Sequence, residues 1–301
     1  MIAESLVFVF MDGFGLGGED SAVNPLAGDD FEAMAALAGG RVTSAGIGVR
    51  EDEDWLVRSI DANLEVEGLP QSGTGQATLF TGVNCSARAG RHYGPFPHST
   101  SKSVIAKQNV FKQVVDSGLV AAFANPYPDR FFTYVERTNR WTVTTLCCLH
   151  AGVNLKTGAD LKKGNAVAAD ITGASWPEQL RDDEIVTPGE AGRRLAVISR
   201  QSNFTLFEFY ATDKAGHSLD YGRARKTLCL FDAFIGGLVA ELDSTQTLLI
   251  TSDHGNVEDM SIKTHTRNPV PLIVKGPGAN VFDSVEDLTG VTPAVLKALG
   301  A

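Results

Sequence analysis

Apolar residues occur along the chain in short runs, and longer stretches with helical spacing of apolar positions separate them. Runs of this length, rich in Val, Leu and Phe, predict strands that are buried on both faces, and their alternation with helices is typical of a βαβ arrangement. We therefore predict an α/β fold in which helices sandwich a mostly parallel sheet. The predicted strands are 6–11, 119–124, 204–210, 247–251 and 271–274, and the predicted helices are 31–38, 77–83, 110–117, 189–200, 221–242 and 292–299.

One stretch, residues 126–188, interrupts this rhythm of strands and helices. It contains an adjacent cysteine pair, Cys147 and Cys148, together with several Gly and Thr residues. We interpret it as a small inserted cap or substrate segment, which leaves residues 1–125 and 189–301 as one catalytic core.

Polar residues that can bind metals follow three of the predicted strands. Asp12 follows the first, Asp213 and His217 follow the third, and Asp253 and His254 follow the fourth. The carboxyl ends of parallel strands meet at one edge of a sheet, where open α/β folds bind ligands. Each residue alone fits an ordinary turn or helix cap. Their shared edge predicts a binding site instead.

A third imidazole, His265, lies just beyond this group. Three aspartates and three histidines offer oxygen and nitrogen donors without a thiolate, a set that suits two divalent ions such as Mn²⁺ or Zn²⁺, with Mg²⁺ as a further possibility. Two such ions about 3.5–4 Å apart can clamp the attacking and leaving oxygens of a phosphoryl transfer.

A nucleophile is available in the segment 69–82. Ser72 and Thr74 stand among glycines before the predicted helix, and a hydroxyl at a helix N-terminus lies beside free N–H groups that attract anions. The local sequence also fits a simple N-cap role for either residue.

The net charge of the chain limits the kinds of molecule that it can bind. The chain has 26 basic and 36 acidic residues, a net charge of −10, which argues against binding nucleic acid through its phosphates. A small phosphorylated substrate remains compatible, because bound divalent ions supply positive charge. No apolar run approaches the about 18 residues of a membrane span, and no basic leader precedes residues 6–11, so we expect a cytoplasmic protein without membrane partners. The sequence does not indicate an oligomeric state.

A glycine motif offers a competing interpretation. Gly13, Gly15 and Gly18 spell GxGxxG after a strand, as in dinucleotide-binding oxidoreductases. The following residues include Pro25 and lack helical periodicity, so the helix that would receive the pyrophosphate is missing. A nucleotide-cofactor oxidoreductase is therefore the alternative to a two-metal phosphoryl-transfer enzyme. A catalytically inactive metal-binding module is the third hypothesis.

The chain resembles the alkaline-phosphatase superfamily of binuclear metalloenzymes, most closely the branch with phosphopentomutase and cofactor-independent phosphoglycerate mutase. The matching segments are FVFMDGFGLG, QSGTGQATLFTG, TDKAGH, SDHGNVEDM and HTRNPVPLIVKG, in the order of the family. The resemblance implies that one metal is held by Asp12, Asp253, His254 and the Ser72 hydroxyl, and the other by Asp213, His217 and His265. It also places Ser72, rather than Thr74, at the nucleophile position, with a phosphoserine intermediate.

The resemblance implies a metal-dependent phosphatase or phosphomutase that acts on a small phosphate ester, with phosphodiesterases as neighbours in the same superfamily. The inserted segment is shorter than the cap of the phosphoglycerate mutase, and no arginine cluster for a second phosphate is evident. A sulfatase is disfavoured, because QSGTGQ lacks the Cys/Ser-x-Pro-x-Arg motif. Beside Thr74, the candidate substrate contacts are His92, Tyr93, Asn125, Arg130 and Lys214.

Overall fold

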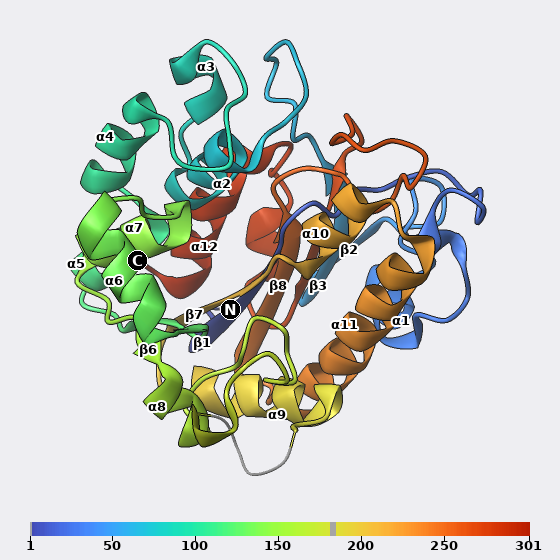
Figure 1. Cartoon of the computed structure of the whole chain (residues 1–301). Helices are drawn as coiled ribbons and strands as arrows, with labels where there is room; N and C mark the ends of the chain where they lie inside the picture. Colours follow the sequence, from blue (N-terminus) through green and yellow to red (C-terminus); the bar gives the residue numbers. More distant parts are fainter. Residues whose placement is uncertain (1, 181–184) are drawn as a thin grey trace.

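Strand β1 (Ser5–Met11) lies inside a seven-stranded sheet that forms the centre of the molecule (Figure 1). The computed structural model describes residues 2–180 and 185–301. Within them the sheet has the order β2-β3-β9-β8-β1-β7-β4, and a separate two-stranded sheet pairs β5 with β6. The other strands are β2 (Arg50–Asp52), β3 (Trp55–Ile60), β4 (Ala121–Phe123), β5 (Pro126–Tyr127), β6 (Lys156–Thr157), β7 (Phe204–Phe209), β8 (Gln246–Ser252) and β9 (Val270–Lys275).

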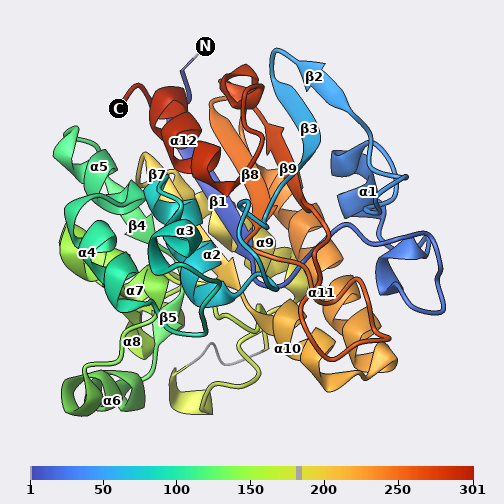
Figure 2. The same ribbon diagram turned by 90° about the horizontal axis from the view of Figure 1, so that it is seen from above.

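Helices cover both faces of this sheet, which confirms the predicted α/β fold (Figures 1 and 2). The helices are α1 (Glu32–Ala38), α2 (Ser72–Thr81), α3 (Cys85–Ala89), α4 (Ser99–Lys107), α5 (Val110–Asp116), α6 (Asp129–Thr138), α7 (Val143–Ala151), α8 (Gly158–Lys162), α9 (Pro188–Ser199), α10 (Ala211–Ser218), α11 (Tyr221–Glu241) and α12 (Val291–Leu299). Short 3₁₀ turns are η1 (Pro25–Ala27), η2 (Glu178–Leu180), η3 (Ala279–Phe282) and η4 (Leu288–Gly290).

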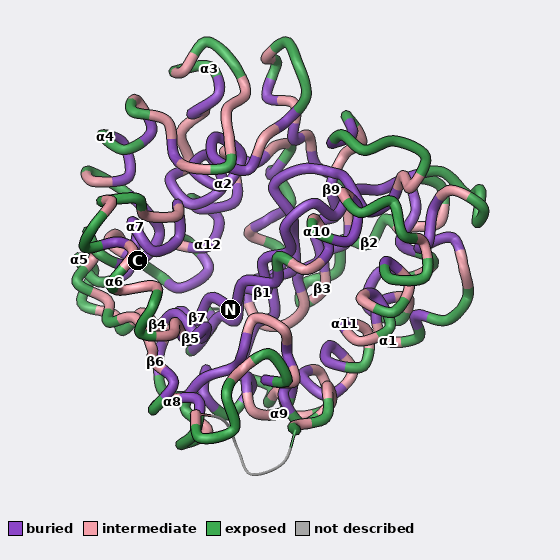
Figure 3. Tube along the Cα trace, in the orientation of Figure 1, coloured by how far each residue is buried: buried purple, intermediate pink, exposed green. Residues whose placement is uncertain are grey.

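The alternation of side chains along β1 builds two cores. Phe8 and Phe10 pack with α2, α5, α7 and α12 on one face, whereas Val7, Val9 and Met11 pack with α1, α9 and α11 on the other. Both sets are almost completely buried, and Figure 3 shows the central strands as the most buried part of the chain. A strand buried on both faces reads as a continuous apolar run, which is why the sequence predicts it.

Strand direction brings the polar residues after β1, β7 and β8 to one edge. These three strands are parallel neighbours, with Met11 beside Phe209 on one side and Ser252 on the other. Strand β9 runs antiparallel to β8, and β3 runs antiparallel to β9, so the predicted mostly parallel sheet includes antiparallel pairs. Strands β2 and β3 were not predicted, because their short, partly exposed sequence gives a weak pattern.

The predicted helix start at residue 77 is wrong, because α2 begins five residues earlier, at Ser72. Gly73 and Gly75 lower the intrinsic helix propensity of this segment. Tertiary contacts override that preference, since every residue from Ser72 to Thr81 is buried.

The division into a core and a cap at 126–188 remains a prediction. Within this stretch α7 packs into the main core through Val143, Leu146, Cys147 and Cys148, whereas Leu161, Ala166 and Ala168 form a small separate cluster. Residues 181–184 of the predicted cap lie outside the described residues. Across the described ranges, the structure contains no helix with the length and apolar character needed to cross a bilayer.

Candidate active site

The first group of candidate metal ligands joins the ends of β1 and β8. Asp12 directly follows β1, and Asp253 and His254 directly follow the neighbouring strand β8. One ligand atom from each of the three residues lies within 4.8 Å of the other two, and all three residues are buried. The parallel register therefore places the predicted carboxylates and imidazole together.

The second group comes from α10 and from the loop before β9. Asp213 and His217 lie one turn apart on α10, so their side chains share a face of the helix. His265 completes the group, and the ligand atoms again lie within 4.8 Å of one another. The Nε2 atom of His265 is 3.1 Å from that of His217, and each is 3.4 Å from Asp213 Oδ1.

The two groups adjoin each other. The rings of His254 and His265 stack with centroids 3.8 Å apart. Gly13, whose φ is +67°, forms the turn between Asp12 and the rest of the loop, and a Cβ atom there would lie 2.8 Å from Asp213 Cβ. Only glycine combines this backbone conformation with so close an approach. The turn after β1 can thus lie directly against α10.

The imidazole orientations fit metal ligands. In all three histidines Nδ1 faces a backbone carbonyl oxygen: that of Lys263 for His217, Pro70 for His265 and Gly255 for His254. A carbonyl only accepts hydrogen bonds, so Nδ1 carries a proton and Nε2 is the nitrogen that faces the cluster, where it can bind a metal once its own proton is released. Metal-bound histidines characteristically donate their other ring N–H in this way.

The carboxylates also retain unused acceptors. Oδ1 of Asp12 and Oδ2 of Asp253 are buried and make no hydrogen bond. The remaining oxygens are held by amides: Gln76 donates to Asp12 Oδ2 at 3.3 Å, and Asn256 donates to Asp213 Oδ1 at 2.6 Å. The oxygens Asp12 Oδ1 and Asp253 Oδ2 lie 3.3 and 3.6 Å from Nε2 of His254. Buried carboxylate oxygens without hydrogen bonds are costly unless a cation compensates them. The residues present therefore fit a divalent metal.

Electrostatics point the same way. Burial raises the pKa of Asp253 well above its usual range, and the charge of Asp12 raises it further. Burial alone would lower the pKa of His254, but the charges of Asp253 and Asp12 raise it to about 10. At Asp213 the effect of burial is outweighed by the hydrogen bond with His265 and the charge of His254, which lower the pKa to about 2. The cluster thus favours added positive charge, which bound metal would supply in place of protons.

Ser72 lies at this centre rather than capping its own helix. Gln71 is the N-cap residue of α2, so the N-cap interpretation of Ser72 is wrong. The Ser72 Oγ atom is 3.0 Å from Nε2 of His254. Thr74 is occupied differently, since its Oγ1 accepts the backbone N–H of Tyr93 at 3.1 Å and donates to the Gln71 carbonyl at 3.4 Å.

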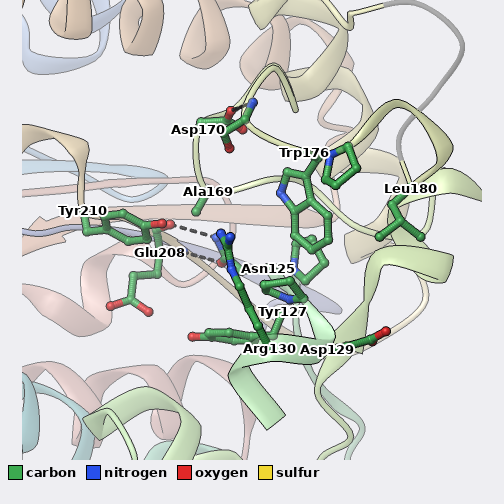
Figure 4. A pocket seen from close by; sticks show the side chains of 14 residues that line it. Asn125, Tyr127, Asp129, Arg130, Ala169, Asp170, Trp176, Leu180, Glu208 and Tyr210 are labelled. Atoms are coloured by element: carbon green, nitrogen blue, oxygen red, sulfur yellow. Dashed lines mark hydrogen bonds between the residues drawn. The ribbon is translucent and has the colours of Figure 1, made fainter. Parts of the chain in front are cut away.

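The other candidate substrate contacts have three different surroundings. Both ring nitrogens of His92 already have partners within the protein, because they lie 3.2 Å from Ser86 Oγ and from the Val66 carbonyl oxygen. Asn125 and Arg130 line a cavity beside the site (Figure 4). The Lys214 ammonium lies 4.2 Å from the centroid of the Tyr210 ring.

Sequence reasoning missed Glu258 as a structural organiser. Its buried carboxylate accepts hydrogen bonds from the backbone of Gly15 at 3.0 Å and Asn256 at 2.7 Å, and from the side chains of Thr266 and Asn268. It thereby joins the turn after β1 to the segments that carry His254 and His265. The acidic residue that follows SDHGN was the available signal.

The glycines after β1 allow the turn there to pack closely against Glu258. Gly15 lies against Glu258, and Gly18 is followed by η1 at Pro25 rather than by a helix. A dinucleotide site requires a helix N-terminus directly after the glycines. The structure does not provide one there.

Comparison with known proteins agrees with this site. Residues 188–301 match the model of the Metalloenzyme superfamily. The 2,3-bisphosphoglycerate-independent phosphoglycerate mutase of Thermomicrobium roseum is 30% identical over 118 residues, which cover 35% of this chain and 22% of that protein. The enzyme of the same name from Pseudomonas fluorescens is 33% identical over 126 residues, which cover 39% and 25%. The match thus spans about a quarter of the length of these curated relatives.

Solved structures share the fold at low sequence identity. The alkaline phosphatase of the Antarctic bacterium TAB5 superposes with a TM-score of 0.59 at 11% identity, covering 99% of this chain and 98% of that one. The PH0037 protein of Pyrococcus horikoshii gives 0.60 at 12%, covering 100% and 98%. The Leishmania mexicana phosphoglycerate mutase gives 0.51 at 12%, covering 99% and 95%. The family model covers residues 188–301, less than half of the chain, and the solved structures show that the chain as a whole has the fold of the alkaline phosphatases.

Proposed function

We propose that this chain is a binuclear metal-dependent phosphoryl-transfer enzyme that acts on a small phosphate ester as a phosphatase or phosphomutase. The observation that carries the proposal is the position of Ser72, whose hydroxyl contacts His254 where two groups of three metal-ligating side chains adjoin. Asp12, Asp253 and His254 would hold one ion together with Ser72. Asp213, His217 and His265 would hold the other.

The metal ions, Mn²⁺ or Zn²⁺, would lower the pKa of the Ser72 hydroxyl and offset the charge of the phosphoryl group. Ser72 Oγ forms a bond to phosphorus while the bond to the ester oxygen breaks, which releases the alcohol and leaves a phosphoserine. Water or a second hydroxyl of the substrate then receives the phosphoryl group. The N-terminal end of α2 favours the negative charge on Ser72 through its helix dipole.

We propose that Lys214 contacts the phosphoryl oxygens. Lys214 directly follows Asp213 in the chain. Burial and the charge of Arg223 lower the pKa of the Lys214 ammonium, and the charges of Asp12 and Asp213 oppose this shift in part. We also propose that residues 126–188 serve as the substrate segment, because they supply most of the wall of the cavity beside the site. The four free cysteines, three of them buried, support a reducing compartment such as the cytoplasm.

Turnover of p-nitrophenyl phosphate with controlled metal content tests this proposal. Chelation should abolish turnover, and added Mn²⁺ or Zn²⁺ should restore it in the wild type but not in Asp213→Ala. Asp116→Ala, at an exposed position on α5, is the matched control and should respond as the wild type does. Turnover that persists in the chelated enzyme would overturn the proposal.

A further inference from the structure

A cavity of about 570 Å³ lies beside the candidate metal centre, between the ends of β4 and β7 and the segment that follows β4 (Figure 4). Its volume is typical of sites that enclose a small organic molecule. Glu208 and Tyr210, at the end of β7, line the cavity together with Tyr127, Asp170 and Trp176 from the segment after β4.

The cavity and the metal centre share structural elements. Tyr210 is the N-cap residue of α10, and Asp213 lies on the first turn of that helix. The Lys214 ammonium rests over the Tyr210 ring, within the influence of the charges of Asp12 and Asp213. A phosphate ester whose phosphoryl group lies at the metal centre can therefore extend its organic part along Tyr210 into the cavity.

The walls offer ring surfaces. Tyr127, Trp176 and Tyr210 all line the cavity, and in the view of Figure 4 the Arg130 side chain extends between Tyr210 and Trp176. The loop before Trp176 is held by Asp170, which accepts hydrogen bonds from the backbone of Gly173 at 3.0 Å and Ser175 at 2.7 Å. The Trp176 side chain packs against the small apolar cluster that contains Leu161. Aromatic side chains held in this way stack on flat rings.

The charge of the lining selects against anions. Among the described residues that line the cavity, Asp129 and Asp170 are acidic and Arg130 is the one basic residue, whereas the buried Glu208 keeps its proton near neutral pH. A carboxylate or a second phosphate on the organic part would meet this excess of acidic groups, and like charges in a partly enclosed site repel. Hydroxyl groups, in contrast, can donate to the carboxylates and accept from Arg130.

We propose that this cavity binds the organic part of the substrate, and that this part is an uncharged, hydroxyl-bearing ring system of nucleoside size. The inference rests on the proposed phosphoryl transfer and narrows its substrate class. It distinguishes this chain from a phosphoglycerate mutase, because phosphoglycerate carries a carboxylate and no ring.

Three phosphate monoesters separate the possibilities: adenosine 5′-monophosphate, glycerol 1-phosphate and 3-phosphoglycerate. With metal-loaded enzyme, kcat/KM should be at least about tenfold higher for the nucleotide than for glycerol 1-phosphate, because stacking adds binding energy. It should be lowest for 3-phosphoglycerate. A preference for 3-phosphoglycerate or glycerol 1-phosphate would overturn the inference and leave the proposed function standing. If no ester, including p-nitrophenyl phosphate, is turned over, the proposed function itself fails, and the inference fails with it.

Substitutions at Trp176 locate the effect. Trp176→Ala should raise KM for the nucleotide about tenfold, whereas Trp176→Phe, which keeps a ring, should stay close to the wild type. Trp55→Ala is the matched control, because Trp55 lies on β3 and packs against Arg50 and Lys275 away from the cavity. Asp129→Asn should raise the ratio of kcat/KM for 3-phosphoglycerate to that for the nucleotide. Equal KM values in Trp176→Ala and the wild type would contradict the proposed role of the cavity.

Discussion

The hydroxyl of Ser72 and the Nε2 atom of His254 are 3.0 Å apart, although 182 positions separate them in the sequence. Helix α2 can approach the end of β8 because Gly75 faces it, and a Cβ atom there would lie 3.0 Å from the Asp253 carbonyl oxygen. The close packing of α2 on β8 thus places a hydroxyl among the candidate metal ligands. Ser72 contacts His254 and does not cap its own helix, which supports the nucleophile role that we propose for it.

The Ser72→Ala variant should lose measurable turnover of phosphate esters and remain folded. Loss of one hydrogen bond costs about 1 kcal/mol, against a folding free energy of roughly 5–15 kcal/mol. Metal binding should weaken and persist, because the carboxylates and imidazoles remain. Steady-state kinetics and urea unfolding measure the two effects.

Thr74→Ala is the control for that experiment. The Thr74 hydroxyl accepts a hydrogen bond from the backbone N–H of Tyr93 and donates one to the Gln71 carbonyl. Neither partner is a histidine. The variant should lose about 1–2 kcal/mol of stability and retain measurable turnover. Normal turnover in Ser72→Ala, or loss of turnover in Thr74→Ala alone, would reassign the nucleophile.

Elemental analysis should find two divalent ions per chain after purification with added Mn²⁺. His217→Ala should reduce this to about one ion, since it removes a ligand from the second group and none from the first. The His217 side chain is 42% exposed, so its loss should scarcely affect folding. His150→Ala, at an exposed position on α7, should keep two ions. Fewer than one ion per chain in the wild type would contradict a binuclear centre.

The Glu258→Ala variant should be less stable and bind metal more weakly. It leaves the buried donors of Gly15, Asn256 and Thr266 and the partly buried donor of Asn268 without their acceptor, at a cost on the order of 3 kcal/mol. Glu258→Gln retains one acceptor oxygen and should show a smaller loss. Urea unfolding and metal titration test this, and an unchanged unfolding midpoint in Glu258→Ala would refute the role assigned to Glu258.

Stability of the metal-free protein should depend on pH through Glu208. Burial, with the charge of Asp12, raises the pKa of Glu208 from 4.5 to about 8. Between these values the folded chain keeps a proton that the unfolded chain releases, so the free energy of unfolding falls as pH rises from about 4.5 to 8. The contribution is at most about 1.4 kcal/mol per pH unit.

The Glu208→Gln variant should remove that dependence. Its free energy of unfolding, measured in urea with chelator between pH 5 and 8, should change less than that of the wild type. Parallel curves for the two proteins would show that Glu208 ionises normally in the fold.

The sequence predicted the parts of the fold that local patterns determine. The strands β1, β7, β8 and β9 are continuous apolar runs, and the residues after the first three of these strands could be placed at one edge because parallel strands share their direction. The start of α2 could not be predicted, since Gly73 and Gly75 oppose a helix that tertiary packing enforces.

The roles of the supporting residues of the site were also not predicted, although Glu258 stands in the segment SDHGNVEDM. Glu258 accepts a hydrogen bond from Gly15, and the charge of Asp12 acts on Glu208. Both partners are distant in the sequence. His92 has the residue type of a substrate contact, yet its ring nitrogens face Ser86 and Val66. Residue type and spacing show which side chains have the chemistry to bind a metal or a substrate. Their neighbours in the fold determine which of them are free to do so.

Trapping of the covalent intermediate tests the central claim most directly. The metal-loaded enzyme is mixed with a phosphate ester labelled in its phosphoryl group, quenched in acid and digested for peptide mapping. We predict that the label is found on Ser72 in the wild type, and that no label is bound in Ser72→Ala. Label on another residue, or turnover of the ester without any labelled peptide under conditions that preserve phosphoserine, would contradict the assignment of Ser72 as the nucleophile.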